Sequence, residues 1–219
     1  MDADSHLQTY SAAELERLAS QQLQELKKLG HFTTPIDIET IVEKLCGIEI
    51  EVQRGLKEQH NIWGYVGVDQ DTNELVIVVD DQLLDLAHLS KIYRMTIAEE
   101  FAHICLHGKA IRNVKTPEDF RTLHNHQDWH DHDRNAKRLA AALLIPAENV
   151  LKDSRKLYKQ MVGIAGYGNP QAIKKHLANE LAEKYRVSVA AMKYRLTEWP
   201  VNVDDKVDSA MREKLDFLD

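Results

Sequence analysis

With 219 residues, of which 43% are hydrophobic and 29% charged, the chain has the balance of a soluble globular protein rather than a disordered one. Its formal net charge of -7 argues against the usual basic kind of nucleic-acid-binding protein. No apolar run approaches the roughly 20 residues that a membrane helix needs. The acidic, polar residues 1–10 also lack the basic and apolar regions of a signal peptide. We therefore expect a cytoplasmic protein that does not contact a membrane.

The first part of the chain predicts two helices. Residues 11–30 open with a capping box, keep leucines at helical spacing and end at a glycine. A second helix is expected over residues 34–47, with Thr34 as its N-cap and Pro35 in its first turn.

The hydrophobic pattern then changes from helical spacing to alternation. Residues 48–52 alternate strictly, residues 63–68 are short and apolar, and residues 74–79 are rich in β-branched side chains. The turn-forming composition between the last two segments predicts a β-hairpin. We expect a small sheet of about three strands.

From residue 83 the pattern is helical again, in a segment that we expect to end at Gly108. The polar residues 109–132 predict a loop, and a compact Ala/Leu-rich helix is expected over residues 134–146. Two more helices follow, over residues 169–185 and 189–196, and the charged last twenty residues predict a tail or a loosely docked helix. The resulting division is a core over 1–150, a helical subdomain over 151–200 and a charged tail over 201–219.

One stretch of the helical second half carries the chemistry of a metal site. Residues 96–108 read TIAEEFAHICLHG, and helical spacing puts Glu99, His103 and His107 on one face. In the His-Glu-x-x-His motif of zinc peptidases, two histidines one turn apart bind the ion and the glutamate acts as general base. In this chain Glu99 takes the first ligand position, Glu100 the base position and His103 the second ligand position.

The glutamate at the first ligand position changes the character of the predicted site. Glutamate is an acceptable zinc ligand, so Glu99 preserves the geometry. The harder, more anionic set of ligands relaxes the preference for zinc over manganese or a similar divalent ion. The motif taken alone also fits a solvated helix face that holds no ion.

Several segments, in chain order, match one known pattern. YRMTIAEEFAHICLH is similar to R-x-T-x-A-H-E-x-x-H-x-x-x-H, NAKRLAAALLIP to E-A-N-x-F-A-A-E-L-L-x-P, and LAEKYRVSVAAMKYRL to L-A-x-x-F-x-V-S-x-x-A-M-x-x-R-L. These are the patterns of the ImmA/IrrE-type metallopeptidases, which the chain resembles over about residues 11–197. The resemblance implies a small zincin-like α+β fold. It also implies proteolysis of a protein partner, typically a helix-turn-helix repressor in phage, mobile-element or stress-response circuits.

The resemblance leaves the third metal ligand open. The family's third ligand, a glutamate, aligns with Asn135, and a neutral amide is a poor zinc ligand. Asp131, one helical turn earlier, is the expected substitute, and His107 and His132 are further candidates as ligands or as supports of the ligands. The predicted site therefore has Glu100 as the catalytic base and, as metal ligands, Glu99, His103 and Asp131.

Two other functions remain as alternatives. An inactive, metal-free relative would keep the fold as a protein-binding regulatory module. A DNA-binding regulator is the third hypothesis, because residues 173–196 read as a helix-turn-helix in which Ser188 caps the second helix. This stretch is locally basic, with Lys174, Lys175, Lys184, Arg186, Lys193 and Arg195. The acidic balance of the whole chain argues against direct nucleic-acid binding.

Overall fold

The computed structural model describes residues 8–69, 71–113, 129–162 and 169–213. The chain divides into two compact units: unit 1 comprises Met1–Thr33 and Asp37–Leu143, and unit 2 comprises Thr34–Ile36 and Leu144–Asp219. None of the described helices combines the length and the apolar character that crossing a membrane requires.

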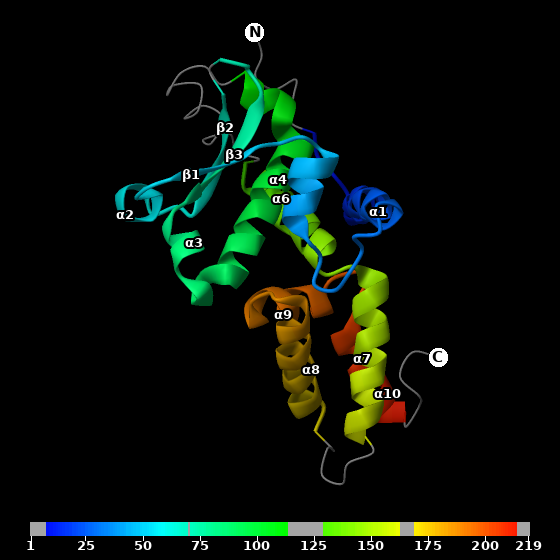
Figure 1. Cartoon of the computed structure of the whole chain (residues 1–219). Helices are drawn as coiled ribbons and strands as arrows, with labels where there is room; N and C mark the ends of the chain where they lie inside the picture. The colour runs from blue at the N-terminus through cyan, green and yellow to red at the C-terminus, as the bar shows by residue number, and fades with distance from the viewer. Residues whose placement is uncertain (1–7, 70, 114–128, 163–168, 214–219) are drawn as a thin grey trace. The chain divides into compact units, whose positions relative to one another are not determined.

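Unit 1 contains a small mixed sheet, drawn in cyan in Figure 1. Its strands are β1 (Ile50–Gln53), β2 (Gly64–Val68) and β3 (Leu75–Asp80), in the order β1-β3-β2. β2 and β3 form the predicted antiparallel hairpin, and β1 runs parallel to β3. All six residues of the central strand β3 are buried, as its β-branched composition predicts. The predicted α+β class and three-stranded sheet are confirmed.

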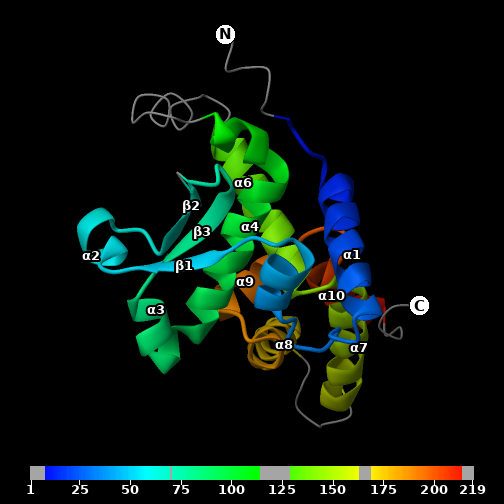
Figure 2. The same cartoon turned by 45° about the horizontal axis from the view of Figure 1, so that its top comes forward.

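The remaining described elements of unit 1 are helical: α1 (Ala12–Lys28), η2 (Thr40–Leu45), α2 (Leu56–His60), α3 (Gln82–Asp85), η3 (Ala87–Leu89), α4 (Ser90–Arg112) and α6 (Trp129–Leu144). α4 packs against β2 and β3, and both views show it beside α6 (Figures 1 and 2). The predicted capping box of α1 is present, since the Glu14 backbone N–H donates to Ser11 Oγ and the Ser11 N–H donates to the Glu14 carboxylate.

The second helical stretch starts later than the sequence predicts. Asp37 Oδ1 accepts a hydrogen bond from the Thr40 backbone N–H at 3.1 Å, and Asp37 Oδ2 accepts one from the Thr40 hydroxyl at 2.8 Å. The Asp37 side chain therefore accepts a free backbone N–H at the start of this stretch, the capping role that the sequence assigned to Thr34. Thr34 and Pro35 are not helical and belong to unit 2.

α4 also runs further than predicted, because Gly108 does not end it. The helix continues to Arg112, and a Cβ added at Gly108 would lie 3.1 Å from Leu75 Cδ1. The glycine at this position allows close approach of the helix to β3 instead of supplying a C-cap. The predicted loop over residues 109–132 is therefore shortened at both ends by helix, and residues 114–128 lie outside the described part of the chain.

Gly64 marks the closest approach of the sheet to α4. A Cβ added there would lie 2.7 Å from Thr96 Cγ2 and 2.8 Å from the Val78 carbonyl oxygen. Because neither the β3 backbone nor the buried Thr96 moves easily, Gly64→Ala should lower the free energy of unfolding by about 1–3 kcal/mol in urea denaturation. Gly67→Ala is the matched control, since its Cβ would meet a side-chain methyl of Val76 at 3.2 Å. An equal loss in both variants would contradict this role for Gly64.

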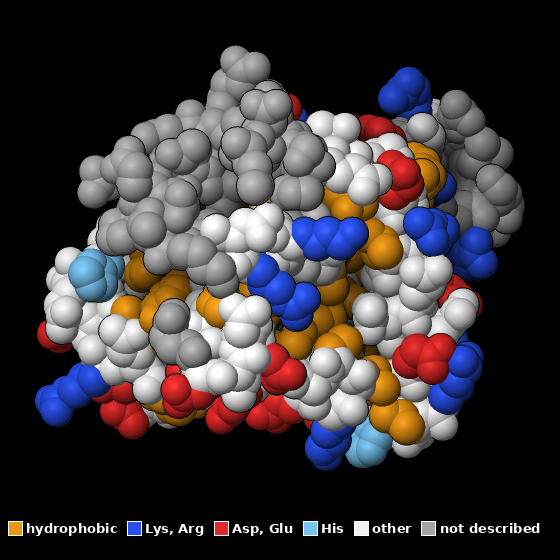
Figure 3. Space-filling view, turned by 90° about the horizontal axis from the view of Figure 1, so that it is seen from above, with side chains coloured by type: hydrophobic (Ala, Val, Ile, Leu, Met, Phe, Trp, Pro, Cys, Tyr) orange, Lys and Arg blue, Asp and Glu red, His pale blue; other side chains and the backbone are white. Residues whose placement is uncertain are grey.

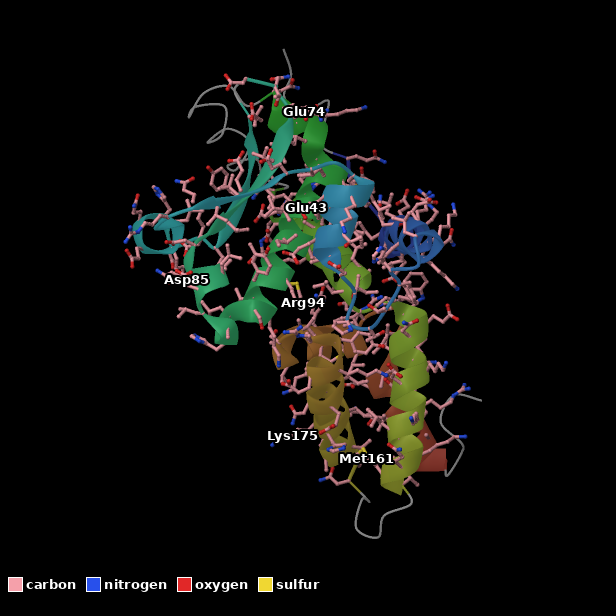
Figure 4. The ribbon with its side chains drawn as sticks, viewed as in Figure 1. Glu43, Glu74, Asp85, Arg94, Met161 and Lys175 are labelled. Carbon is pink, nitrogen blue, oxygen red and sulfur yellow. The ribbon has the colours of Figure 1, made fainter. Side chains whose placement is uncertain are left out.

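Unit 2 is helical in its described residues, with α7 (Ala147–Val162), α8 (Pro170–Tyr185), α9 (Val189–Thr197) and α10 (Val203–Glu213). Asn169 caps α8 with Pro170 in the first turn, as predicted. Met161 near the end of α7, labelled in Figure 4, and Tyr185 at the end of α8 are both buried.

The unit boundary and the C-terminal segment differ from the sequence-based division. Unit 2 takes up the chain at Leu144, so the boundary expected at residue 150 falls inside α7. Of the two forms expected for the last twenty residues, a charged tail or a loosely docked helix, residues 203–213 take the helical one, and Val203 and Val207, fully buried one turn apart, pack it firmly. Two apolar positions at this spacing are enough to anchor a helix whose other positions are charged.

Candidate metal centre

The candidate site of unit 1 lies between α4 and α6. On α4, Ile97, Ala98 and Phe101 are buried in the core. Glu99 and His103, one turn apart, are placed on the side of α4 that contacts α6. Arg94, labelled in Figure 4, lies on α4 N-terminal to these two residues.

Three side chains from the two helices bring potential ligand atoms together. One oxygen of Glu99, one ring nitrogen of His103 and one oxygen of Asp133 lie within 4.8 Å of one another. The distance from His103 Nε2 to Asp133 Oδ1 is 3.7 Å. Bonds of about 2.1 Å to a tetrahedral ion separate two ligand atoms by about 3.4 Å, so these three atoms need to close by only a small distance to bind one ion.

A lysine contacts both carboxylates of this cluster. Lys137 Nζ lies 2.6 Å from Asp133 Oδ2 and 3.7 Å from Glu99 Oε1. The interaction with His103 and the hydrogen bond from Lys137 hold the pKa of Asp133 at about 2. Burial raises the pKa of Glu99, and the charge of Lys137 opposes that rise.

Glu100 is the predicted general base, and it is the more strongly perturbed of the two adjacent glutamates. Burial raises its pKa to about 7. A carboxylate with a pKa near neutrality accepts a proton from water far more readily than one with an ordinary pKa. The protonation behaviour of Glu100 therefore suits the role that its position in the motif predicts.

Aromatic rings from both helices surround His103. The Trp129 ring stacks on it with centroids 5.9 Å apart and an angle of 6° between the planes, and the His107 ring lies 5.7 Å away. His107 is 1% exposed, and its Nε2 lies 3.5 Å from the His132 carbonyl oxygen. Burial lowers the pKa of His107 to about 4, so its ring is neutral at physiological pH. His107 therefore packs against the ring of His103, and the His132 ring meets His107 edge-on with centroids 4.9 Å apart.

The structure puts Asp133, not Asp131, in the cluster of ligand atoms. Asp131 is 54% exposed in its side chain and forms an ion pair with Arg134 at 2.7 Å. Positions 131 and 133 of a helix are separated by about 200° around its axis, so the two aspartates lie on opposite sides of α6. Asn135 is buried, and the same helical geometry places it on the side of Asp131.

Asp133, Lys137 and Trp129 are thus residues of this site that sequence reasoning missed. Asp133 directly precedes the helix predicted over residues 134–146, and Lys137 lies four residues further on, a spacing typical of an ion pair. Such pairs are common on exposed helix faces, so the spacing alone did not connect them with the motif on α4.

The residues present fit a divalent cation. Two carboxylate oxygens and one imidazole nitrogen are donors that zinc, manganese and iron accept. Three protein ligands leave a position open for water, which is the arrangement of catalytic rather than structural zinc sites. Among the described residues, Lys137 contacts both carboxylates of the cluster, and an ion bound there would have to displace it.

The chain matches the model of one known protein family. The family model described as the IrrE N-terminal-like domain, Peptidase M78, matches residues 83–197, which is more than half of the chain. The matched segment contains both α4 and α6 and continues through α9. None of the curated proteins matches the chain. The match confirms the resemblance carried by the sequence motifs and supports a function of the metallopeptidase type. This chain belongs to the Peptidase M78 family, with an IrrE N-terminal-like domain.

Proposed function

We propose that this protein is a metal-dependent endopeptidase whose ion is held by Glu99, His103 and Asp133. The observation that carries the proposal is the convergence of their three donor atoms within 4.8 Å, with the partly buried Glu100 adjacent to Glu99 in the chain. Zinc is the expected ion. The two carboxylates also make manganese or another divalent ion acceptable.

In this mechanism the chain's own residues handle the proton. A divalent ion, when bound, supplies Lewis-acid chemistry that makes water more acidic and a peptide carbonyl more electrophilic. Glu100, with its pKa near 7, accepts the proton of the attacking water and delivers it to the amine that leaves. His107 and Trp129 fix the ring of His103, which keeps its nitrogen aimed at the cluster.

The proposed substrate is a protein, and specifically a helix-turn-helix transcriptional repressor. The family resemblance supports this class of substrate. In the described part of the sheet, β2 is an edge strand, and it packs against the helix that carries Glu99 and His103. An edge strand next to a peptidase site suits an extended segment of substrate, which would add to the sheet through backbone hydrogen bonds.

The position of Lys137 favours one alternative. Its ammonium group already contacts both carboxylates of the cluster. A protein in which this ion pair persists would be a metal-free relative that binds a partner without cleaving it.

The DNA-binding alternative gains no support from unit 2. Lys174 pairs with Asp208 at 2.7 Å and Lys184 pairs with Asp153 at 2.6 Å. Arg195 is buried and donates to a backbone carbonyl. Half of the six basic residues that suggested a DNA-binding surface are therefore engaged within the unit. Among the described side chains visible in Figure 3, Lys and Arg are interspersed with Asp and Glu.

Metal content tests the proposal. Protein purified without a chelator and without a metal-affinity column should contain about one equivalent of zinc, manganese or iron. Because the ion binds only the folded state, EDTA should lower the melting temperature and added metal should restore it. Elemental analysis and thermal denaturation are the measurements. Absence of stoichiometric metal, with no gain in stability on adding it, would favour the metal-free alternative.

Cleavage of a repressor is the second arm of this test. A helix-turn-helix repressor encoded beside the gene for this chain is the substrate to use, with gel electrophoresis and mass spectrometry of the fragments. Metal-loaded protein should cut it at defined positions, and EDTA-treated protein should not. Metal binding without cleavage of such a repressor would leave the metal site in place and reject the proposed substrate.

A further inference from the structure

Lys137 places a positive charge at the edge of the candidate metal centre. Its Nζ donates a hydrogen bond to Asp133 Oδ2 at 2.6 Å and lies 3.7 Å from Glu99 Oε1. The two carboxylates belong to different helices, so the ammonium group links α6 to α4 at the point where an ion would do the same. The Lys137 side chain is 55% exposed, which allows it to swing into solvent without repacking of the core.

The ammonium group and a divalent ion make the same kind of electrostatic contribution to this site, since each places positive charge between the two carboxylates. Glu99 and Asp133 bring two carboxylates close together in partly buried positions, where like charges repel more strongly than in water. A cation between them relieves that repulsion. An ion bound to both carboxylates would lie within a few ångströms of the present position of Nζ, so the two cations repel each other.

We propose that Lys137 competes with the metal ion for the carboxylates of Glu99 and Asp133. In the metal-free protein it stabilises the cluster, and on metal binding it moves away, so that its presence lowers the affinity for the ion. This inference rests on the metal site of the proposed function and adds to it a residue that sets metal affinity.

A neighbouring ion pair provides a matched control. Arg134 lies on the same helix and pairs with Asp131 at 2.7 Å, with a side chain 56% exposed. Arg134 and Lys137 thus carry the same charge, have nearly the same exposure and each contact an aspartate of α6. Only Lys137 also contacts a carboxylate on α4.

The experiment compares Lys137→Met with Arg134→Met in a titration with Zn²⁺ buffered by a competing chelator. Methionine keeps most of the length of the lysine side chain and removes its charge. Lys137→Met should bind zinc about tenfold more tightly than the unmodified protein. The change is modest because the Lys137 side chain, at 55% exposure, is partly screened by water. Arg134→Met should change the affinity by less than about twofold, since it removes the same charge away from the cluster.

Thermal denaturation of the metal-free proteins gives a second readout that does not depend on activity. Lys137→Met should lower the melting temperature, and this loss should shrink when Glu99→Gln is already present, because one of the repelling charges is then absent. A loss of the same size in both backgrounds would show that Lys137 does not act through Glu99.

The outcomes separate the failure of this inference from the failure of the proposed function. If the unmodified protein binds zinc and Lys137→Met binds it equally tightly or more weakly, the inference is overturned and the proposed function stands. Zinc binding by Lys137→Met but not by the unmodified protein supports the inference. It also shows that the unmodified chain is not a zinc enzyme. Absence of binding of Zn²⁺, Mn²⁺ and Fe²⁺ in both proteins, with circular dichroism showing both folded, overturns both.

Discussion

Replacing Glu100 with glutamine is expected to lower the rate of substrate cleavage by about 10³-fold, within the range that a general base contributes. Glutamine has the size of glutamate but does not accept the proton of the attacking water. Burial has already raised the pKa of Glu100 to about 7, which makes it the carboxyl of this site best suited to exchange a proton near neutral pH. The measurement is the initial rate of repressor cleavage by metal-loaded protein.

Two further measurements make this result specific. Glu100→Gln should keep its metal content, since Glu100 is not one of the three residues of the ligand cluster, and it should not lower the melting temperature, since it removes a carboxylate whose ionisation burial disfavours. Glu43→Gln is the matched control: Glu43 is an exposed glutamate on η2, labelled in Figure 4, and its loss should leave the rate unchanged. Cleavage by Glu100→Gln at the rate of the unmodified protein would remove Glu100 from the mechanism.

Replacing Asp133 with asparagine is expected to weaken metal binding at least about a hundredfold. Loss of a residue that only supports a ligand costs about 10–100-fold in affinity, so loss of a ligand itself should cost at least the upper end of that range. The amide of asparagine keeps the shape of the side chain but is a poor ligand for zinc. Chelator-buffered titration with Zn²⁺ measures the change.

Asp131→Asn is the comparison that distinguishes the two aspartates of α6. Asp131 is exposed and paired with Arg134, so its replacement should change metal affinity by less than about threefold, as for other exposed ion pairs. A large loss in Asp131→Asn with none in Asp133→Asn would mean that α6 presents its opposite side to α4. Loss in both variants would indicate that the helix as a whole had been disturbed, which circular dichroism and the melting temperature would reveal.

Local patterns account for what the sequence predicted correctly. The alternation of residues 63–68 and 74–79 around a turn predicts the β2–β3 hairpin, because both strands and their connection are contiguous in the chain. The capping box of α1 is likewise contained within four residues. The spacing of Glu99 and His103 sets them on one face of a helix, whatever that helix packs against.

Helix ends were less predictable, because packing outweighs the preferences of single residues. Gly108 is the kind of residue that ends helices, yet α4 continues past it since the glycine is used for contact with β3. Asp37, rather than Thr34, caps the second helical stretch. The charged composition of the last twenty residues hid the buried Val203 and Val207 of α10.

The sequence by itself determined the family, the α+β class and the half of the candidate site that lies on α4, because these depend on motifs and on spacing along one helix. The tertiary structure alone decided the other half. Once residues 129–144 form a helix, Asp131 and Asp133 lie on opposite sides of it, but the rotation of α6 about its axis is set by packing against α4. That rotation brings Asp133 and Lys137 to Glu99 and His103 and leaves Asp131 paired with Arg134 in solvent.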